Sequence, residues 1–178
     1  MIKKLRLLIT KECPKNCEGC CNKDWKLNKL PIVKHYNYDE VIITGGEPLN
    51  PYSTWGKTEL LLDYLNYIDI NPKRKVYIYT ANPDTYKILW KCDGITLTLH
   101  DQQSADEFFD EYHHKFKETY NLIKYRKNII LSLRLNIFKD IKIPEDIDLS
   151  IWNVKSDIEW IKDCPLPEDE IFMRTKTI

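Results

Sequence analysis

The stretch Glu40-Val-Ile-Ile-Thr-Gly-Gly-Glu-Pro48 decides the fold of this chain. Its first half is a short apolar run that ends in turn residues, a pattern typical of a buried parallel strand. Similar strand patterns lie on both sides of it, at residues 4–10, 75–80, 95–100, 129–138 and 149–154, and helical patterns lie between them at residues 54–68, 84–91 and 104–127. Strands that alternate with helices in this way predict right-handed βαβ units and a parallel sheet in an α/β protein.

Two of the predicted strands carry polar side chains on one face. In residues 95–100 the leucines share one face while Thr96, Thr98 and His100 share the other, and residues 131–136 alternate leucine with Ser, Arg and Asn in the same way. A flat parallel sheet covered on both faces would be apolar throughout. We therefore expect a curved, partial (β/α)6 barrel with parallel strands, short or missing helices and a polar interior. The alternative is an antiparallel sheet with one face in water.

The composition is typical of one globular domain. The 178 residues are 43% hydrophobic and 30% charged, and we expect a single domain over residues 1–178 with an irregular tail over about residues 156–178. Lys plus Arg equals Asp plus Glu, at 27 each, and this balance disfavours a large nucleic-acid interface, which needs a basic excess. No window approaches the roughly 20 apolar residues of a membrane span, and the N-terminus lacks a signal-peptide pattern. We expect a cytoplasmic protein with no membrane partner.

The spacing of the six cysteines indicates a metal site rather than a disulfide framework. Four of them lie within nine residues, as CxxxCxxC with one more cysteine directly after it: Cys13, Cys17, Cys20 and Cys21. Thiolates bind iron–sulfur clusters, and three of them leave one iron of a 4Fe–4S cluster open to another ligand. Zinc is the alternative, although a closed zinc site usually takes four ligands in two separated pairs. We expect Cys21, Cys92 and Cys164 to be buried thiols.

A glycine pair after the strand at residues 40–45 adds a second group of candidate residues. Gly45 and Gly46 let the backbone approach a ligand closely, and Glu47, followed by Pro48, offers an acceptor for an ammonium group. A Gly-Gly pair after a strand also marks an ordinary tight turn. The functional interpretation gains weight because the cysteine loop follows the preceding predicted strand.

CxxxCxxC after the first strand and GGEP after the second resemble the two signatures of the radical S-adenosylmethionine (SAM) superfamily. The resemblance implies a 4Fe–4S cluster on Cys13, Cys17 and Cys20, with the amino and carboxylate groups of SAM on the open iron. It assigns the SAM amino group to Gly45, Gly46, Glu47 and Pro48. It also implies that an electron from the cluster cleaves SAM to methionine and a 5′-deoxyadenosyl radical, which abstracts hydrogen from a substrate.

One departure from the family pattern lies inside the cysteine loop. Family members usually carry an aromatic residue just before the third cysteine, near the adenine, where this chain has Gly19. The stretch from Cys17 to Trp25, with Gly19 and Asn22, is similar to the CxGCxNxxxW pattern of the activating proteins of anaerobic ribonucleotide reductase. That similarity implies an oxidoreductase that installs a radical on a partner protein and takes its electron from a donor such as flavodoxin or ferredoxin.

Four residues on the polar faces of two strands are further candidates for cofactor binding: Thr98, His100, Arg134 and Asn136. By alternation they point inward, and the position of Thr98 and His100 resembles that of polar residues facing SAM in related activating enzymes. The guanidinium of Arg134 suits the carboxylate of SAM or of a substrate. The alternatives are a structural histidine and a structural ion pair.

The leading hypothesis is therefore a radical SAM enzyme that activates a partner protein under anaerobic conditions. One alternative is a radical SAM enzyme that modifies a small molecule, a nucleotide or a peptide. The other comes from a different class and is a non-catalytic module that binds zinc or an iron–sulfur cluster.

Overall fold

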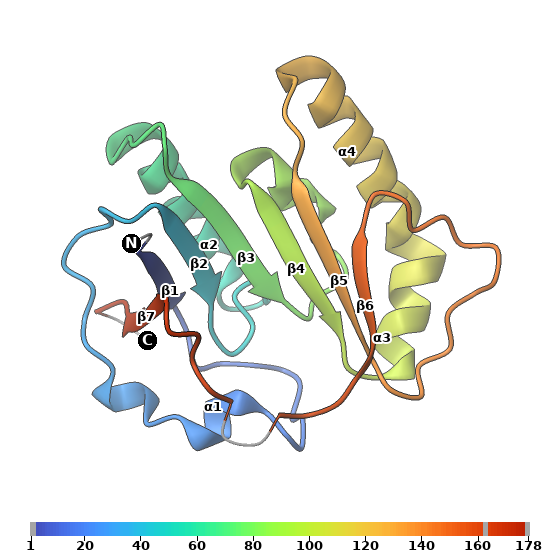
Figure 1. Ribbon diagram of the computed structural model, residues 1–178, viewed down its shortest axis with the longest axis horizontal. Helices are drawn as coiled ribbons and strands as arrows, with labels where there is room; N and C mark the ends of the chain where they lie inside the picture. The colour runs from blue at the N-terminus through green and yellow to red at the C-terminus, as the bar shows by residue number, and fades with distance from the viewer. Residues whose placement is uncertain (1–2, 162–163, 177–178) are drawn as a thin grey trace. The chain divides into compact units, whose positions relative to one another are not determined.

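The computed structural model describes residues 3–161 and 164–176 of the chain. The protein has an α/β fold, and the strand pairs within each part of the chain run parallel (Figure 1). The chain divides into two compact units, Met1–Tyr79 with Trp160–Ile178, and Thr80–Glu159. The expected α/β class with parallel strands is confirmed, and the antiparallel alternative is wrong. The expected single domain stays a prediction.

Four parallel strands of the first unit lie in the order β3-β2-β1-β7. Their bounds are Lys4–Leu8 for β1, Glu40–Thr44 for β2, Lys75–Thr80 for β3 and Glu170–Arg174 for β7. Leu5 of β1 pairs with Val41 of β2, which pairs with Val76 of β3, and all three side chains are buried. The helical elements of this unit are α1 (Cys21–Asp24), the 3-10 helix η1 (Leu27–Lys29), α2 (Trp55–Asp63) and its π-helical continuation η2 (Tyr64–Ile68).

A small apolar cluster fastens the segment after the cysteine loop to strands β1 and β7. Its buried members are Leu8, Leu27 and Phe172, and Trp25, Leu30 and Leu166 pack against them. Trp25 meets Phe172 edge-on with 5.1 Å between the ring centroids. The first and last parts of the chain are thus held together by apolar contacts as well as by strand pairing.

The second unit contains three parallel strands in the order β6-β5-β4. The bounds of its elements are η3 Tyr86–Lys91, β4 Gly94–Leu99, α3 Gln102–Glu107, η4 Phe108–Tyr112, α4 His113–Lys127, β5 Ser132–Phe138 and β6 Asn153–Ile158. On β5 the side chains of Leu133 and Leu135 are buried while Arg134 is exposed and Asn136 is half-buried. The predicted alternation of apolar and polar faces is confirmed for this strand.

Two expectations about the C-terminal third are wrong. The sixth strand, expected at residues 149–154, lies at Asn153–Ile158, because buried Trp152 packs on Phe108 and Phe116 in the turn before the strand. The tail expected to be irregular over residues 156–178 contains β7, which pairs with β1 along its whole length. Ion pairs from Arg6 to Glu170 (2.7 Å) and from Lys4 to Asp169 (2.8 Å) support this pairing.

Candidate functional site

The cysteine loop, residues 11–20, leaves the C-terminal end of β1. Buried Leu7 and Leu8 fix the strand, and the Ile9 N–H extends the pairing to the Thr44 carbonyl of β2 at 3.0 Å. The loop carries three cysteines outside any disulfide, of which Cys13 is exposed and Cys17 and Cys20 are half-buried. Cys20 stands directly before α1, and its carbonyl accepts a hydrogen bond from Lys23 N–H at 2.9 Å.

Electrostatics link Cys13 to three other acidic groups of this site. Desolvation of the thiol is the largest cause that raises the pKa of Cys13, although the residue as a whole is exposed. The negative charges of Glu47, Cys17 and Cys20 raise this pKa further, while a backbone hydrogen bond at Lys15 lowers it. Neighbouring acidic groups therefore make the Cys13 thiol harder to ionise.

The glycine pair packs its backbone directly on the cysteine loop. Gly46 N–H donates to the Thr10 carbonyl at 2.9 Å, and Glu47 N–H donates to the Glu12 carbonyl at 2.8 Å. A Cβ atom at Gly45 would stand 2.7 Å from Thr10 O, and one at Gly46 would stand 2.7 Å from Lys11 O and even closer to Glu12 O. The two glycines are therefore required for contact between the two loops, a role that the sequence interpretation, which considered a ligand contact or a tight turn, did not include.

Glu47 is the buried acid of this site, with 3% of its surface exposed. Its Oε1 accepts the Leu49 N–H at 2.9 Å, and its carbonyl accepts the Thr54 hydroxyl at 2.7 Å. The Thr58 hydroxyl of α2 donates to the carbonyl of buried Pro48. The Leu49 bond orients the carboxylate of Glu47, and the two threonine bonds hold the backbone of the segment that leads into α2 (Trp55–Asp63).

A side chain from α1 completes the contact between the loops. Asn22 Nδ2 donates to the Gly45 carbonyl at 2.9 Å. Sequence reasoning used Asn22 only as part of a family-like stretch and missed this contact. Its position two residues after the third cysteine of the motif is the signal that could have found it.

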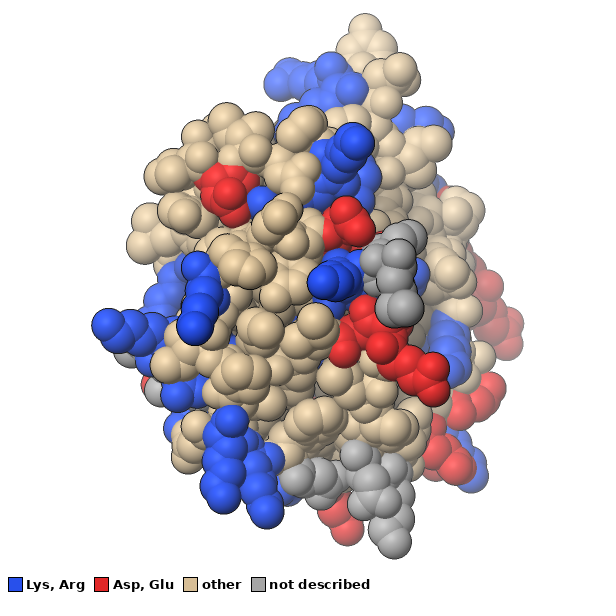
Figure 2. Space-filling view, turned by 60° about the vertical axis from the view of Figure 1, so that its left-hand side comes forward, with Lys and Arg blue, Asp and Glu red and all other residues tan. Residues whose placement is uncertain are grey.

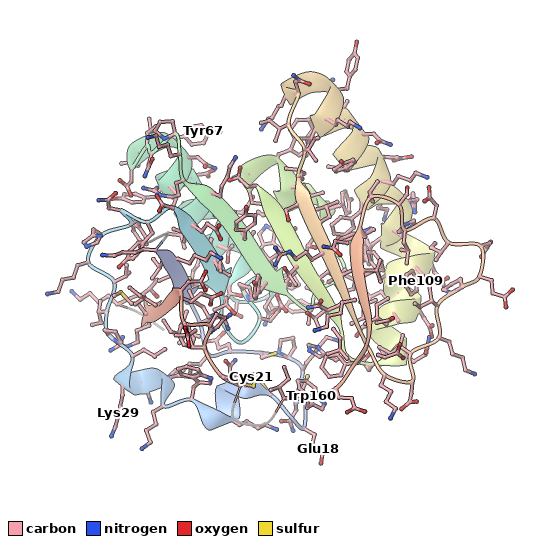
Figure 3. The ribbon with its side chains drawn as sticks, in the orientation of Figure 1. Glu18, Cys21, Lys29, Tyr67, Phe109 and Trp160 are labelled. Carbon is pink, nitrogen blue, oxygen red and sulfur yellow. A yellow bond between two sulfur atoms is a disulfide. The ribbon has the colours of Figure 1, made fainter. Side chains whose placement is uncertain are left out.

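The expectation that Cys21 and Cys164 are buried thiols is wrong, because they form a disulfide with 5.5 Å between their Cα atoms (Figure 3). The pairing of β7 with β1 brings the end of the chain back to the cysteine loop, and spacing along the sequence does not reveal such a return. The same segment brings Trp160 against Gly19, where an added Cβ would collide with the Trp160 ring. The position that lacks an aromatic residue in the sequence is thus packed by one from elsewhere in the chain.

The remaining candidates lie in the second unit, on neighbouring strands. Thr98 of β4 pairs in register with Asn136 of β5, and Asn136 Nδ2 donates to Thr98 Oγ1 at 3.4 Å. The His100 ring lies 4.9 Å from that of Phe138, and the exposed Arg134 pairs in register with Thr96. Thr98 and Asn136 therefore contact each other while Arg134 is exposed, and the role of all four candidates in binding stays a prediction.

Within residues 3–161 and 164–176, no group of three or more His, Cys, Asp or Glu side chains is arranged to hold a metal ion. The thiolates of a cluster bind separate irons, so their sulfurs need not converge on one point as zinc ligands do. The chemistry of the donors, three cysteine thiols of one loop, fits such a cluster.

Comparison of the chain with protein-family models and with curated proteins finds no match to either. In the part of the chain that the structure describes, every helix is too short or too polar to cross a membrane.

Proposed function

We propose that this protein is a radical SAM enzyme, an oxidoreductase that holds a 4Fe–4S cluster on Cys13, Cys17 and Cys20. The observation that carries the proposal is the backbone contact between the cysteine loop and the segment Gly45–Gly46–Glu47, which sets a buried carboxylate near a loop with three cysteines outside any disulfide. When bound together, the cluster and SAM supply a 5′-deoxyadenosyl radical for hydrogen abstraction.

The residues of this chain have distinct tasks in the proposed enzyme. The three thiols bind the cluster as thiolates, which makes metal loading release protons. Glu47 accepts the ammonium group of SAM, and its bond from Leu49 N–H fixes the carboxylate for that contact. Gly45 and Gly46 hold Glu47 against the cysteine loop because they alone allow the two backbones to approach.

The proposal also covers the type of barrel, the partner protein and the electron donor, and each of these rests on one observation. Parallel strand pairing supports a partial (β/α)6 barrel, to which β7 adds a strand. The stretch from Cys17 to Trp25 supports an activating enzyme that acts on a partner protein, with a flavodoxin or ferredoxin as electron donor. Lys, Arg, Asp and Glu side chains are interspersed on the face in Figure 2, in line with the expectation that nucleic acid is not the partner.

Anaerobic purification followed by iron and sulfide analysis tests the cluster. We expect a brown protein with about four irons per chain, and after reduction with dithionite we expect SAM to be cleaved to 5′-deoxyadenosine. Cys17→Ala should abolish both results, while Cys92→Ser, which removes a thiol outside the loop, should leave them intact. A colourless protein with stoichiometric zinc would overturn the proposal.

The substrate class needs a separate experiment. Co-expression with a glycyl-radical enzyme should give an electron paramagnetic resonance doublet if the protein is an activating enzyme. Turnover of a small molecule, nucleotide or peptide without that doublet would favour the alternative within the superfamily. A protein that binds the cluster but does not cleave SAM would instead be a non-catalytic module.

A further inference from the structure

The last part of the chain is attached to the cysteine loop at successive points. We name residues 160–161 and 164–166 the C-terminal strap. Trp160 packs on Gly19, Cys164 is bonded to Cys21, and Leu166 packs on the apolar cluster around Leu8. Figure 3 labels Trp160 and Cys21. The first contact falls on the loop between Cys17 and Cys20, and the second falls on the residue directly after Cys20.

The covalent contact is open to exchange with solvent thiols. Cys21 and Cys164 are separated by 143 positions in the sequence. Cys21 is exposed and Cys164 is half-buried. Exposed disulfides are the ones that react readily and serve regulatory roles. The attachment of Leu166 and the pairing of β7 with β1 do not depend on the disulfide, so the strap stays anchored at its far end when the bond is reduced.

We propose that Cys21 and Cys164 form a thiol–disulfide latch on the cysteine loop. The closed latch holds the Trp160 ring over Gly19 and so shields the half-buried Cys17 and Cys20. Reduction frees Cys164 from Cys21, the Trp160 ring leaves Gly19, and the thiols of Cys17 and Cys20 become accessible. The claim that the latch regulates loading of the cluster rests on the proposed function. The claim that reduction makes Cys17 and Cys20 accessible does not.

The chemistry of the latch is an ordinary two-electron exchange. The Cys21 thiolate attacks the disulfide of oxidised glutathione, forms a mixed disulfide and releases one glutathione thiolate. The Cys164 thiolate then attacks the Cys21 sulfur, which closes the protein disulfide and releases the second. The protein loses two electrons and two protons, and both appear in two molecules of reduced glutathione. A dithiol reductant reverses the sequence and is itself oxidised to a disulfide.

Alkylation of the metal-free, full-length protein tests the latch. One sample is oxidised with glutathione disulfide and one is reduced with dithiothreitol; both are then exposed briefly to iodoacetamide at the same pH. Trypsin releases Cys17, Cys20 and Cys21 on one peptide, residues 16–23, in which fragmentation separates the sites. We expect Cys17 and Cys20 to react roughly tenfold faster in the reduced protein, as for groups that become accessible after local opening.

Variants distinguish the effect of the disulfide on the alkylation rate from the effect of the indole ring, with Cys92→Ser as the control. Cys164→Ser should react at the fast rate under both conditions, and Cys21→Ser provides the same test if the first variant does not fold. Trp160→Ala should speed the reaction while the disulfide remains, because the ring is the shield. Cys92→Ser should behave as the wild type.

The outcomes distinguish the latch from the proposed function. Equal alkylation rates in oxidised wild type and Cys164→Ser, or absence of the Cys21–Cys164 bond after oxidation, would overturn the latch. If alkylation behaves as expected, supply of iron and sulfide should then load the reduced protein faster than the oxidised one. Failure of both forms to take up iron would count against the proposed function and leave the alkylation result standing.

Discussion

The side-chain amide of Asn22 donates a hydrogen bond to the Gly45 carbonyl across 2.9 Å. The donor lies in α1, just after the cysteine loop, and the acceptor lies at the end of β2 (Glu40–Thr44). Together with the bonds from Gly46 and Glu47 to the loop backbone, it joins the two candidate motifs into one structural element. Their association therefore does not depend on a bound ligand.

Removal of the Asn22 bond should weaken this element. Asn22→Ala should lower the free energy of unfolding by about 1 kcal/mol, and Asn22→Asp by about 1–3 kcal/mol because a carboxylate oxygen then faces the Gly45 carbonyl. Asn28→Ala removes the exposed Lys11–Asn28 hydrogen bond of 2.7 Å and serves as the control, with an expected effect below about 0.5 kcal/mol. Urea denaturation measures all three. Equal losses for Asn22→Ala and Asn28→Ala would show that the contact contributes no special stability.

The two loops should not tolerate a side chain at their closest approach. Gly46→Ala should destabilise the protein by about 1–3 kcal/mol, because its Cβ meets the backbone oxygens of Lys11 and Glu12 rather than a flexible side chain. Gly56→Ala is the matched control, since nothing lies within 4 Å of its Cβ and the residue is in a helix. It should stabilise by about 0.5–1 kcal/mol. If thermal denaturation shows that both variants change the stability of the protein in the same direction, this role of Gly46 is contradicted.

The parts of the fold that were predicted correctly are those with a local signal. Strand β2 was found because it is an apolar run bounded by turn residues, and β4 was found because apolar and polar residues alternate along it. β6 lacks that signal, because most of its residues are exposed, and the apolar residues near it include Trp152 in the preceding turn. β7 was missed because its position depends on pairing with β1, and Arg6 and Glu170 meet only after the chain returns.

The candidate site likewise has parts with a local sequence signal and parts without one. The cysteine spacing and the glycine pair are local motifs, and their contact follows from parallel strands whose ends share one edge. The Cys21–Cys164 disulfide and the packing of Trp160 on Gly19 join residues far apart in sequence, through a strand that the sequence did not reveal. From the sequence, Cys21 and Cys164 were expected only to be buried thiols.

The disulfide should contribute measurably to stability. It closes a loop of 143 residues, so reduction should lower the free energy of unfolding by about 2–5 kcal/mol through the freedom that the unfolded chain gains. Urea denaturation with and without dithiothreitol measures the difference. Cys164→Ser should show the same loss without reductant, and dithiothreitol should have no further effect on it. If dithiothreitol does not change the urea denaturation midpoint of the wild type, the bond is not formed in solution.

Cys92 should make the protein less stable at alkaline pH. Burial of its thiol, which donates to the Ile88 carbonyl at 3.6 Å, raises the pKa from 9.0 to about 12. Below pH 9 the thiol is protonated in both the folded and unfolded states; between these two pKa values it ionises only in the unfolded chain, so stability is lost as the pH rises. At a pH midway between them the loss from this group is about 2 kcal/mol. Since tyrosines and lysines titrate in the same range, the measurement is the difference in pH dependence between wild type and Cys92→Ser, which lacks the ionising thiol. Parallel stability curves for the two proteins would mean that the Cys92 thiol ionises as readily in the folded protein as in the unfolded chain.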